Sequence, residues 1–144
     1  MQSNERALAL VKKVTALPGF TSAMGVEVLF ASPGEVHMQL RRKPDLLQFN
    51  GFFHGGVISA LADHAAGGAV STALPAGKIA ITIDLHVNFL APARGETIVA
   101  RAKAIQVGST VCTARVEIFS VGAGSEDLCA HAVVALRVVD MQMP

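Results

Sequence analysis

Residues 54–63 read HGGVISALAD: a His-Gly-Gly step, an apolar run and then a single carboxylate. The sequence is apolar almost all round over 55–73, which predicts a helix buried in the core rather than one on the surface. Asp63 is the only Asp, Glu, Lys or Arg between Leu46 and Gly77. A buried charge is costly unless it is paired or used in chemistry. Asp63 therefore either has a structural partner elsewhere in the fold or marks an active site.

Two elements are expected on the N-terminal side of this helix. The first is an amphipathic helix over 4–17, ended by the Pro-Gly step at 18–19. Its apolar stripe consists of Ala7, Leu10, Val14 and Leu17. The second is a hairpin of strands at 23–31 and 35–42, because the Ser-Pro-Gly sequence at 32–34 is a strong turn signal.

The C-terminal half is predicted to consist of strands. Four are expected, at 79–90, 97–107, 110–121 and 127–139. Their short connections favour an antiparallel meander. The fold class is therefore α+β, with one curved antiparallel sheet of five or six strands wrapped around one long buried helix. With 144 residues, the chain is expected to form one domain spanning 1–144.

The strand at 79–90 alternates between two rows of side chains. The apolar row, which is expected to pack on the buried helix, consists of Ile79, Ile81, Ile83, Leu85, Val87 and Phe89. The polar row consists of Thr82, Asp84, His86 and Asn88. Strict alternation places Thr82 on the face opposite the one that packs on the helix.

Composition narrows the classes of function. Lys and Arg number 12 against 11 Asp and Glu, which argues against an electrostatic nucleic-acid binder. The N-terminus has no apolar signal run, and no segment has the roughly 20 apolar residues of a membrane span. Cys112 and Cys129 are expected to be free core residues in a reducing compartment, which favours a cytoplasmic protein. The apolar fraction of 51% favours burial of surface in a homo-oligomer.

The start of the buried helix offers backbone hydrogen-bond donors. Gly55 and Gly56 let a ligand approach first-turn N–H groups at the positive end of the helix dipole, as in an oxyanion hole. A plain turn into a helix is the simpler alternative. Ser59, one turn before Asp63, could donate a hydrogen bond to the carboxylate, and Gly67, one turn after, leaves space for a ligand. A carboxylate beside an apolar space suits a general base or a nucleophile.

The spacing of these groups bears on assembly. Gly55 and Asp63 are separated by about 12 Å along one helix. A reacting carbonyl needs both its oxyanion donor and its attacking group within roughly 3 to 3.5 Å. One helix cannot readily supply both. If both groups are catalytic, they come from two copies of the chain, and the site lies across a dimer interface.

Other chemistries lack their sequence patterns. No C-x-x-C, H-E-x-x-H or cluster of carboxylates indicates a metal, and no G-x-S-x-G frame surrounds Ser59. His64 directly follows Asp63, and adjacent helix residues point about 100° apart, so the two are not a catalytic pair. The basic run at 41–43 is expected to be a solvated strand end, with contact to substrate phosphates as the alternative.

Two motifs resemble the hotdog-fold acyl-CoA thioesterases of the phenylacetate-pathway type. The first, at 48–63, contains G-x-x-H-G-G and L-A-D, and the second, at 82–93, contains N-F-L-x-P-A. The resemblance extends over residues 20–140. Together the motifs are specific for the family but not for the substrate.

The resemblance implies hydrolysis of an acyl-CoA thioester by homodimers that often pair into tetramers, with CoA as part of the substrate and no cofactor. Asp63 matches the carboxylate that activates water or attacks the thioester, and the Gly55 amide matches the oxyanion donor. His54 matches a residue that shapes the oxyanion side. Thr82 matches a hydroxyl that positions the water, which requires that its face of the strand, or a bulge, meet the site.

One position departs from the family pattern. Six residues before the His, the family carries an Asn that helps to hold the nucleophile or the thioester. Here that position is Gln48, and Asn50 stands two residues later. Either side chain can make the same hydrogen bonds.

Two other functions are compatible with this fold. A non-catalytic acyl-CoA-binding module would need the pocket but not the carboxylate, so Asp63 counts against it. A hydratase acting on enoyl thioesters would need a D-x4-H spacing, which the sequence lacks. Medium-chain and aryl acyl groups fit the sequence equally, as do a general-base and an anhydride mechanism.

Overall fold

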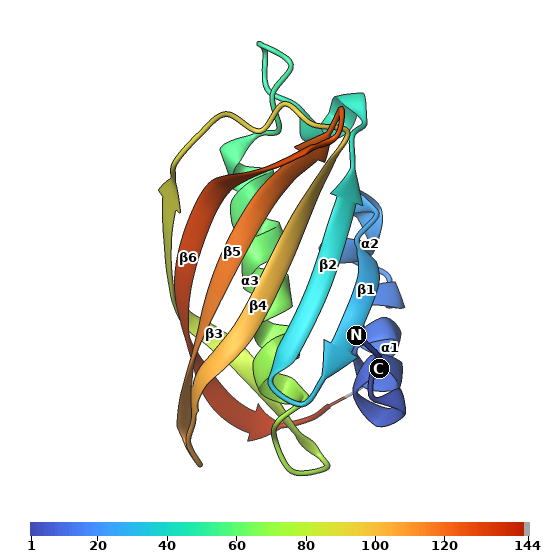
Figure 1. Cartoon of the computed structure of the whole chain (residues 1–144). Helices are drawn as coiled ribbons and strands as arrows, with labels where there is room; N and C mark the ends of the chain where they lie inside the picture. Colours follow the sequence, from blue (N-terminus) through green and yellow to red (C-terminus); the bar gives the residue numbers. More distant parts are fainter. Residues whose placement is uncertain (143–144) are drawn as a thin grey trace.

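The structure, a computed structural model, describes residues 1–142 and consists of a curved antiparallel sheet packed around the central helix α3 (Figure 1). The helices and strands are α1 (Glu5–Ala16), α2 (Phe20–Met24), β1 (Glu27–Ser32), β2 (Glu35–Arg41), the 3-10 helix η1 (Pro44–Leu46), α3 (Gly55–Ser71), β3 (Lys78–Phe89), β4 (Thr97–Val107), β5 (Val111–Gly122) and β6 (Ser125–Asp140). The predicted α+β class and the helix wrapped by a sheet are confirmed, and the sheet has six strands.

The N-terminal elements follow the prediction with one difference. β1 and β2 form the expected antiparallel hairpin, and Gly34 in its turn has a φ of +84°, which favours glycine. The first strand begins later than expected, because residues 20–24 form the short helix α2. Gly25 ends α2 in the left-handed conformation, at a φ of +87°, before β1 starts.

The strand order is β1-β2-β4-β5-β6-β3, so the prediction of a continuous meander is wrong for β3. β4, β5 and β6 form a meander, but β3 pairs with β6 and lies at the edge of the sheet. The segment after β3 crosses the end of the sheet to reach β4 (Figure 1). Two hydrogen bonds attach this segment to other parts of the chain, so β3 and β4 do not form a hairpin. Leu90 N–H donates to the Cys129 carbonyl at 2.8 Å, and Phe53 N–H donates to the Ala93 carbonyl at 3.0 Å.

A β-bulge in β3 changes which side chains face α3. Thr82 and Asp84 pair with consecutive residues of β6, so Ile83 between them is the extra residue. Ile81 and Ile83 are 56% and 60% exposed, whereas Val87, beyond the bulge, packs against the core. The prediction that one apolar row packs on the helix along the whole strand is therefore wrong for the N-terminal half of β3. The bulge reverses the two rows and turns Thr82 toward α3.

The core lies between α3 and the concave face of the sheet. The helix contributes small, fully buried side chains, among them Ala62, Ala65 and Ala69. The sheet contributes larger ones, among them Met38, Ile98 and Ile118. Small residues on the helix let its axis approach the strands closely, and the larger strand residues fill the remaining space at the density of a close-packed interior.

The helix α1 lies beside β1, at the rim of the sheet (Figure 1). Asn4 caps α1 by accepting a hydrogen bond from Ala7 N–H at 3.0 Å, and its own N–H donates to the Ala31 carbonyl at 2.9 Å. Ala7 and Val11 are each 3% exposed and join the core. These contacts hold α1 at a fixed place next to α3.

Two further expectations concern the cysteines and membrane spans. Cys112 and Cys129 are buried and free, as predicted, and burial raises the pKa of the Cys129 thiol to about 11. Neither α3 nor any other helix within residues 1–142 combines the length and apolar character that crossing a bilayer requires.

Candidate active site

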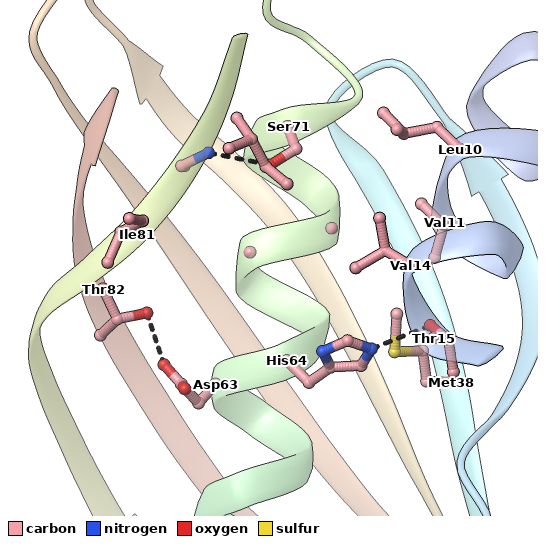
Figure 2. A pocket seen from close by; sticks show the side chains of 14 residues that line it. Leu10, Val11, Val14, Thr15, Met38, Asp63, His64, Ser71, Ile81 and Thr82 are labelled. Atoms are coloured by element: carbon pink, nitrogen blue, oxygen red, sulfur yellow. Dashed lines mark hydrogen bonds between the residues drawn. The ribbon is translucent and has the colours of Figure 1, made fainter. Parts of the chain in front are cut away.

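Asp63 and Thr82 meet between α3 and β3. The Thr82 hydroxyl donates a hydrogen bond to Asp63 Oδ1 at 2.6 Å (Figure 2). Thr82 reaches the carboxylate because the bulge at Ile83 begins directly after it. The expected contact between Asp63 and Thr82 therefore forms within one chain, because the bulge turns Thr82 toward α3.

A hollow of about 430 Å³ lies next to this pair, over the face of α3 that carries Gly67. A Cβ atom added to Gly67 would meet no atom within 4 Å, so the predicted space beside Asp63 exists. The predicted hydrogen bond from Ser59 to Asp63 does not. Ser59 Oγ donates instead to the Gly55 carbonyl one turn earlier, at 2.9 Å, which is a common local bond for a helical serine.

His54 is the N-cap of α3 rather than a group free to act on a ligand through Nδ1. Its Nδ1 accepts a hydrogen bond from Gly56 N–H at 2.9 Å, so the neutral ring carries its proton on Nε2. The N–H groups of Val57 and Ile58 donate to the His54 carbonyl at 3.0 and 3.1 Å. Within residues 1–142, the Gly55 N–H is left without an acceptor at this helix start.

Gln48 and Asn50 lie in the loop before α3 and line a second hollow together with Gly55. Asn50 is exposed, and its Oδ1 accepts a hydrogen bond from Phe52 N–H at 3.3 Å. The Gln48 side chain is partly buried and has no hydrogen-bond partner in the part of the chain that the structure describes. The second hollow therefore combines a free backbone donor with a free amide side chain.

The two hollows have no lining residue in common. Asp63 and Thr82 line the first, and Gly55, Gln48 and Asn50 line the second. Within one chain the predicted site residues thus form two groups at different positions along α3. His54 contributes to the second group through its cap of Gly56.

Sequence reasoning missed the contribution of α1 to the first hollow. Leu10 and Val14 of α1 line it, although their apolar spacing indicated only a packing stripe. His64 Nε2 and Thr15 Oγ1 lie 2.8 Å apart and connect α3 to α1. Burial lowers the pKa of the His64 imidazole below its ordinary value of 6.5, and the charge of Asp63 opposes this in part. No local pattern links α1 to His64, because 49 residues separate the bonded pair.

Phe89 was likewise assigned only to a packing row. It lies against the helix start, where a Cβ atom added to Gly55 would come within 3.2 Å of its ring. For metals, the described residues contain no group of three or more His, Cys, Asp or Glu that could hold an ion.

Comparisons with known proteins agree with the fold and the motifs. Residues 50–125 match the model of the thioesterase superfamily. A protein of Halobacterium salinarum is 39% identical over 78% of this chain and 77% of its own length. The 1,4-dihydroxy-2-naphthoyl-CoA hydrolase of Listeria monocytogenes is 28% identical over 64% of this chain and 75% of its own length.

Solved structures agree with this placement. A thioesterase family protein of Silicibacter pomeroyi superposes with a TM-score of 0.89 at 26% identity, covering 94% of this chain and 99% of its own. The PaaI protein of Escherichia coli, from the phenylacetic acid degradation operon, has the same fold, with a TM-score of 0.84 at 18% identity over 96% and 97% of the two chains. Because the family model spans more than half of the chain and the fold agrees, this chain belongs to the thioesterase superfamily and is a hotdog-fold thioester hydrolase.

Proposed function

We propose that this protein hydrolyses the thioester bond of acyl-CoA molecules at a site shared by two copies of the chain. The observation that carries the proposal is the separation of the Asp63–Thr82 pair from the free N–H of Gly55. These groups lie about 12 Å apart along α3. A carbonyl that contacts both needs them within roughly 3 to 3.5 Å. A second subunit that brings its own helix start to Asp63 meets this requirement.

In the proposed reaction Asp63 acts on the thioester carbonyl carbon. As a general base it takes a proton from water, whose oxygen bonds to the carbon. As a nucleophile its own oxygen bonds to the carbon, and water cleaves the resulting anhydride. In both routes the carbonyl oxygen becomes negative and accepts a hydrogen bond from the amide of a Gly55 in the other subunit. In the general-base route the carbon–sulfur bond then breaks, and the proton that Asp63 took from water passes to the leaving thiolate, giving the carboxylic acid and the CoA thiol. In the nucleophilic route the carbon–sulfur bond breaks to leave the anhydride and the CoA thiolate. Water then cleaves the anhydride; one of its protons stays on the released carboxylic acid and the other passes through Asp63 to the thiolate. The Thr82 hydroxyl orients the carboxylate and the water.

The choice of acyl-CoA as substrate has two supports. The Listeria relative is named as a hydrolase of a CoA thioester. In addition, the hollow beside Asp63 is lined mainly by apolar residues and glycines, which suits an acyl group better than a polar one. We propose that no cofactor takes part, because water and the named groups suffice for hydrolysis.

The edge strand β3 supports a homodimer, with dimers of dimers as the larger assembly. β3 is twelve residues long and ends the strand order. Ile81, Ile83 and Phe89 on it are each more than half exposed. A long apolar edge strand needs a cover, and a second copy of the chain can provide one. We also propose a cytoplasmic location, which the two free, buried thiols favour.

Gln48 is our candidate for the role that an Asn plays in the family. Its side chain is free and lines the same hollow as Gly55, whereas the oxygen of Asn50 is engaged by Phe52 N–H. A longer side chain that is still available can hold the thioester from this side.

A mixing experiment tests the shared site. Wild-type protein is first assayed for thiol release against acetyl-, octanoyl- and benzoyl-CoA. Asp63→Asn and Gly55→Pro proteins are then mixed under conditions of subunit exchange. Pro is tolerated at the first position of a helix, so Gly55→Pro removes the N–H that is free there without breaking the helix. A mixed dimer regains one intact site of two, so random exchange restores about a quarter of wild-type activity.

Gly55→Ala is the matched control, because it adds a Cβ against Phe89 but keeps the N–H. No thiol release from any acyl-CoA by wild-type protein would refute the enzymatic proposal and favour a binding module. Thiol release by the wild type with no recovery in the mixture, when mass spectrometry confirms exchange, would refute the shared site alone.

A further inference from the structure

The hollow beside Asp63 is elongated along α3. It reaches from the Asp63–Thr82 pair to Ser71, whose Oγ accepts a hydrogen bond from Ala80 N–H at 3.1 Å. These ends are two helical turns apart, about 12 Å. β3 forms one side and α1 the other (Figure 2). Gly67 of α3 belongs to the lining and leaves open space above the helix. Its volume of about 430 Å³ lies in the range of small-molecule sites.

The polar side chains around the hollow are bonded to protein groups. Thr82 donates to Asp63, Ser71 accepts from a backbone N–H, and His64 bonds to Thr15 (Figure 2). Among the described residues, the second oxygen of Asp63 and Nδ1 of His64, both at one end of the hollow, are the side-chain groups left for a ligand, and apolar residues and glycines make up most of the remaining lining. An extended hydrocarbon chain with a reactive carbonyl at the Asp63 end matches this distribution.

Glycine at position 67 leaves open space in the hollow. A Cβ there would meet no atom within 4 Å, whereas a Cβ at the neighbouring Gly68 would touch Met38 at 3.4 Å and Val36 at 3.5 Å. A larger side chain at position 67 would therefore enter the open space and leave the packed core untouched. Glycine inside a helix costs about 1 kcal/mol relative to alanine, so this residue is unfavourable for the helix itself.

The outer wall of the hollow belongs to α1, and a side-chain hydrogen bond ties this helix directly to α3. Leu10 and Val14 of α1 line the hollow and are only partly buried. Thr15, one residue after Val14, is 5% exposed and bonds to His64 on α3 at 2.8 Å. This bond fixes the distance between α1 and α3 next to the proposed catalytic carboxylate.

We infer that the hollow binds an extended aliphatic acyl chain, that Leu10 and Val14 limit its bulk, and that the Thr15–His64 hydrogen bond holds these two residues in position. The inference rests on the proposed function, since it names the acyl group of the proposed substrate. Leu10 and Val14 would be specificity-determining residues, and Thr15 and His64 positioning residues.

The first test fills the hollow. Gly67→Leu is expected to lower kcat/KM for octanoyl-CoA by roughly tenfold or more relative to kcat/KM for acetyl-CoA, because the longer chain needs the filled space. Val14→Ala widens the hollow and is expected to raise activity toward a branched acyl-CoA relative to octanoyl-CoA. Lys12→Ala, on the exposed face of the same helix, is the control that should leave all ratios unchanged.

The second test addresses the bond between the helices. Thr15→Val removes the hydroxyl while keeping the shape, and Thr15→Ser keeps a hydroxyl. We expect Thr15→Val to raise KM for octanoyl-CoA severalfold with little change for acetyl-CoA, and Thr15→Ser to restore the wild-type KM. An equal change for both substrates, or no rescue by Ser, would show that the bond serves stability alone.

The outcomes separate this inference from the proposed function. If wild-type protein cleaves acyl-CoAs but folded Gly67→Leu keeps the wild-type ratio of octanoyl to acetyl activity, the acyl site is elsewhere and the proposed function stands. If wild-type protein cleaves none of them, calorimetry with the thioether S-octyl-CoA replaces the assay. Binding that is at least tenfold weaker in Gly67→Leu would then support the hollow as a chain-binding site, and equal binding would refute it.

Discussion

The start of α3 and its middle carry complementary chemistry on one helix. The start supplies a free backbone N–H at Gly55, with the positive end of the helix dipole behind it. The middle supplies a carboxylate, a hydroxyl bonded to it and a hollow lined mainly by apolar residues, whereas the free backbone N–H lies at the helix start. Under the proposed function each region supplies half of a hydrolytic site, and the difference teaches that one rigid helix keeps these two sets of groups apart.

Removal of the Asp63 charge should have the largest effect. Asp63→Asn keeps the size of the side chain and an oxygen that Thr82 can bond, but it removes the proposed base or nucleophile. We expect kcat to fall roughly 10²- to 10⁴-fold. The measurement is steady-state thiol release, with circular dichroism to confirm folding. A fall of less than threefold in folded protein would mean that the middle of α3 is not the reacting region.

Removal of the Gly55 N–H at the helix start should have the second-largest effect on kcat. Gly55→Pro removes the proposed oxyanion donor and is expected to lower kcat roughly 10²- to 10³-fold. Gly55→Ala meets the same Phe89 ring but retains the N–H, so its loss measures the steric part. If the Pro and Ala variants lose equal activity, the Gly55 N–H does not stabilise the transition state. The helix start would then not supply the oxyanion donor.

Much of this comparison was predictable from sequence, because its signals are local. The long apolar stretch and the His-Gly-Gly step predicted α3 and its first residue, and the isolated charge singled out Asp63. The predicted bond from Ser59 to Asp63 is wrong because a helical serine can also donate to the carbonyl one turn earlier, and Ser59 bonds the Gly55 carbonyl in this way.

The remaining features depend on contacts between distant segments. Alternation runs unbroken through β3, so nothing local marks Ile83 as a bulge; the bulge follows from pairing with β6. The same holds for the edge position of β3, which is set by its partner strand and not by its short connection to β4. The wall that α1 forms over the hollow depends on a bond between residues 49 positions apart.

Substitution of Thr82 tests whether the hydroxyl that the bulge turns toward Asp63 contributes to kcat. Thr82→Val removes the hydroxyl that donates to Asp63 and keeps the branched shape. Hydrogen bonds to charged groups contribute about 1.5–3 kcal/mol, which corresponds to roughly a tenfold to hundredfold fall in kcat. Thr82→Ser is the matched control and should stay near wild type. Equal activity of the Thr82→Val and wild-type proteins would show that the Thr82 hydroxyl makes no contribution to catalysis.

A smaller effect, on KM, should distinguish the side-chain amides of Gln48 and Asn50 in the loop before α3. Gln48→Ala removes a free side chain that lines the hollow with Gly55, whereas Asn50→Ala removes one whose oxygen already bonds Phe52 N–H. Loss of one uncharged hydrogen bond to substrate corresponds to about 0.5–1.5 kcal/mol, so we expect up to a tenfold rise in KM for Gln48→Ala. Asn50→Ala should change KM less. The reverse order would assign the family's Asn role to Asn50.

His64 should affect stability and the placement of α1 rather than the bond-making step, although it adjoins Asp63 in sequence, because its ring bonds Thr15 on α1. Burial lowers its pKa from 6.5 in the folded state, so the unfolded chain binds its proton more readily. Between the lowered pKa and pH 6.5, the free energy of unfolding therefore rises with pH, by at most about 1.4 kcal/mol per pH unit from this group. In His64→Gln, which can still bond Thr15, that part of the slope should vanish in denaturant titrations from pH 5 to 7.5. Identical slopes in both proteins would mean that the His64 imidazole has the same pKa in the folded and the unfolded chain, which would contradict its desolvation by α1.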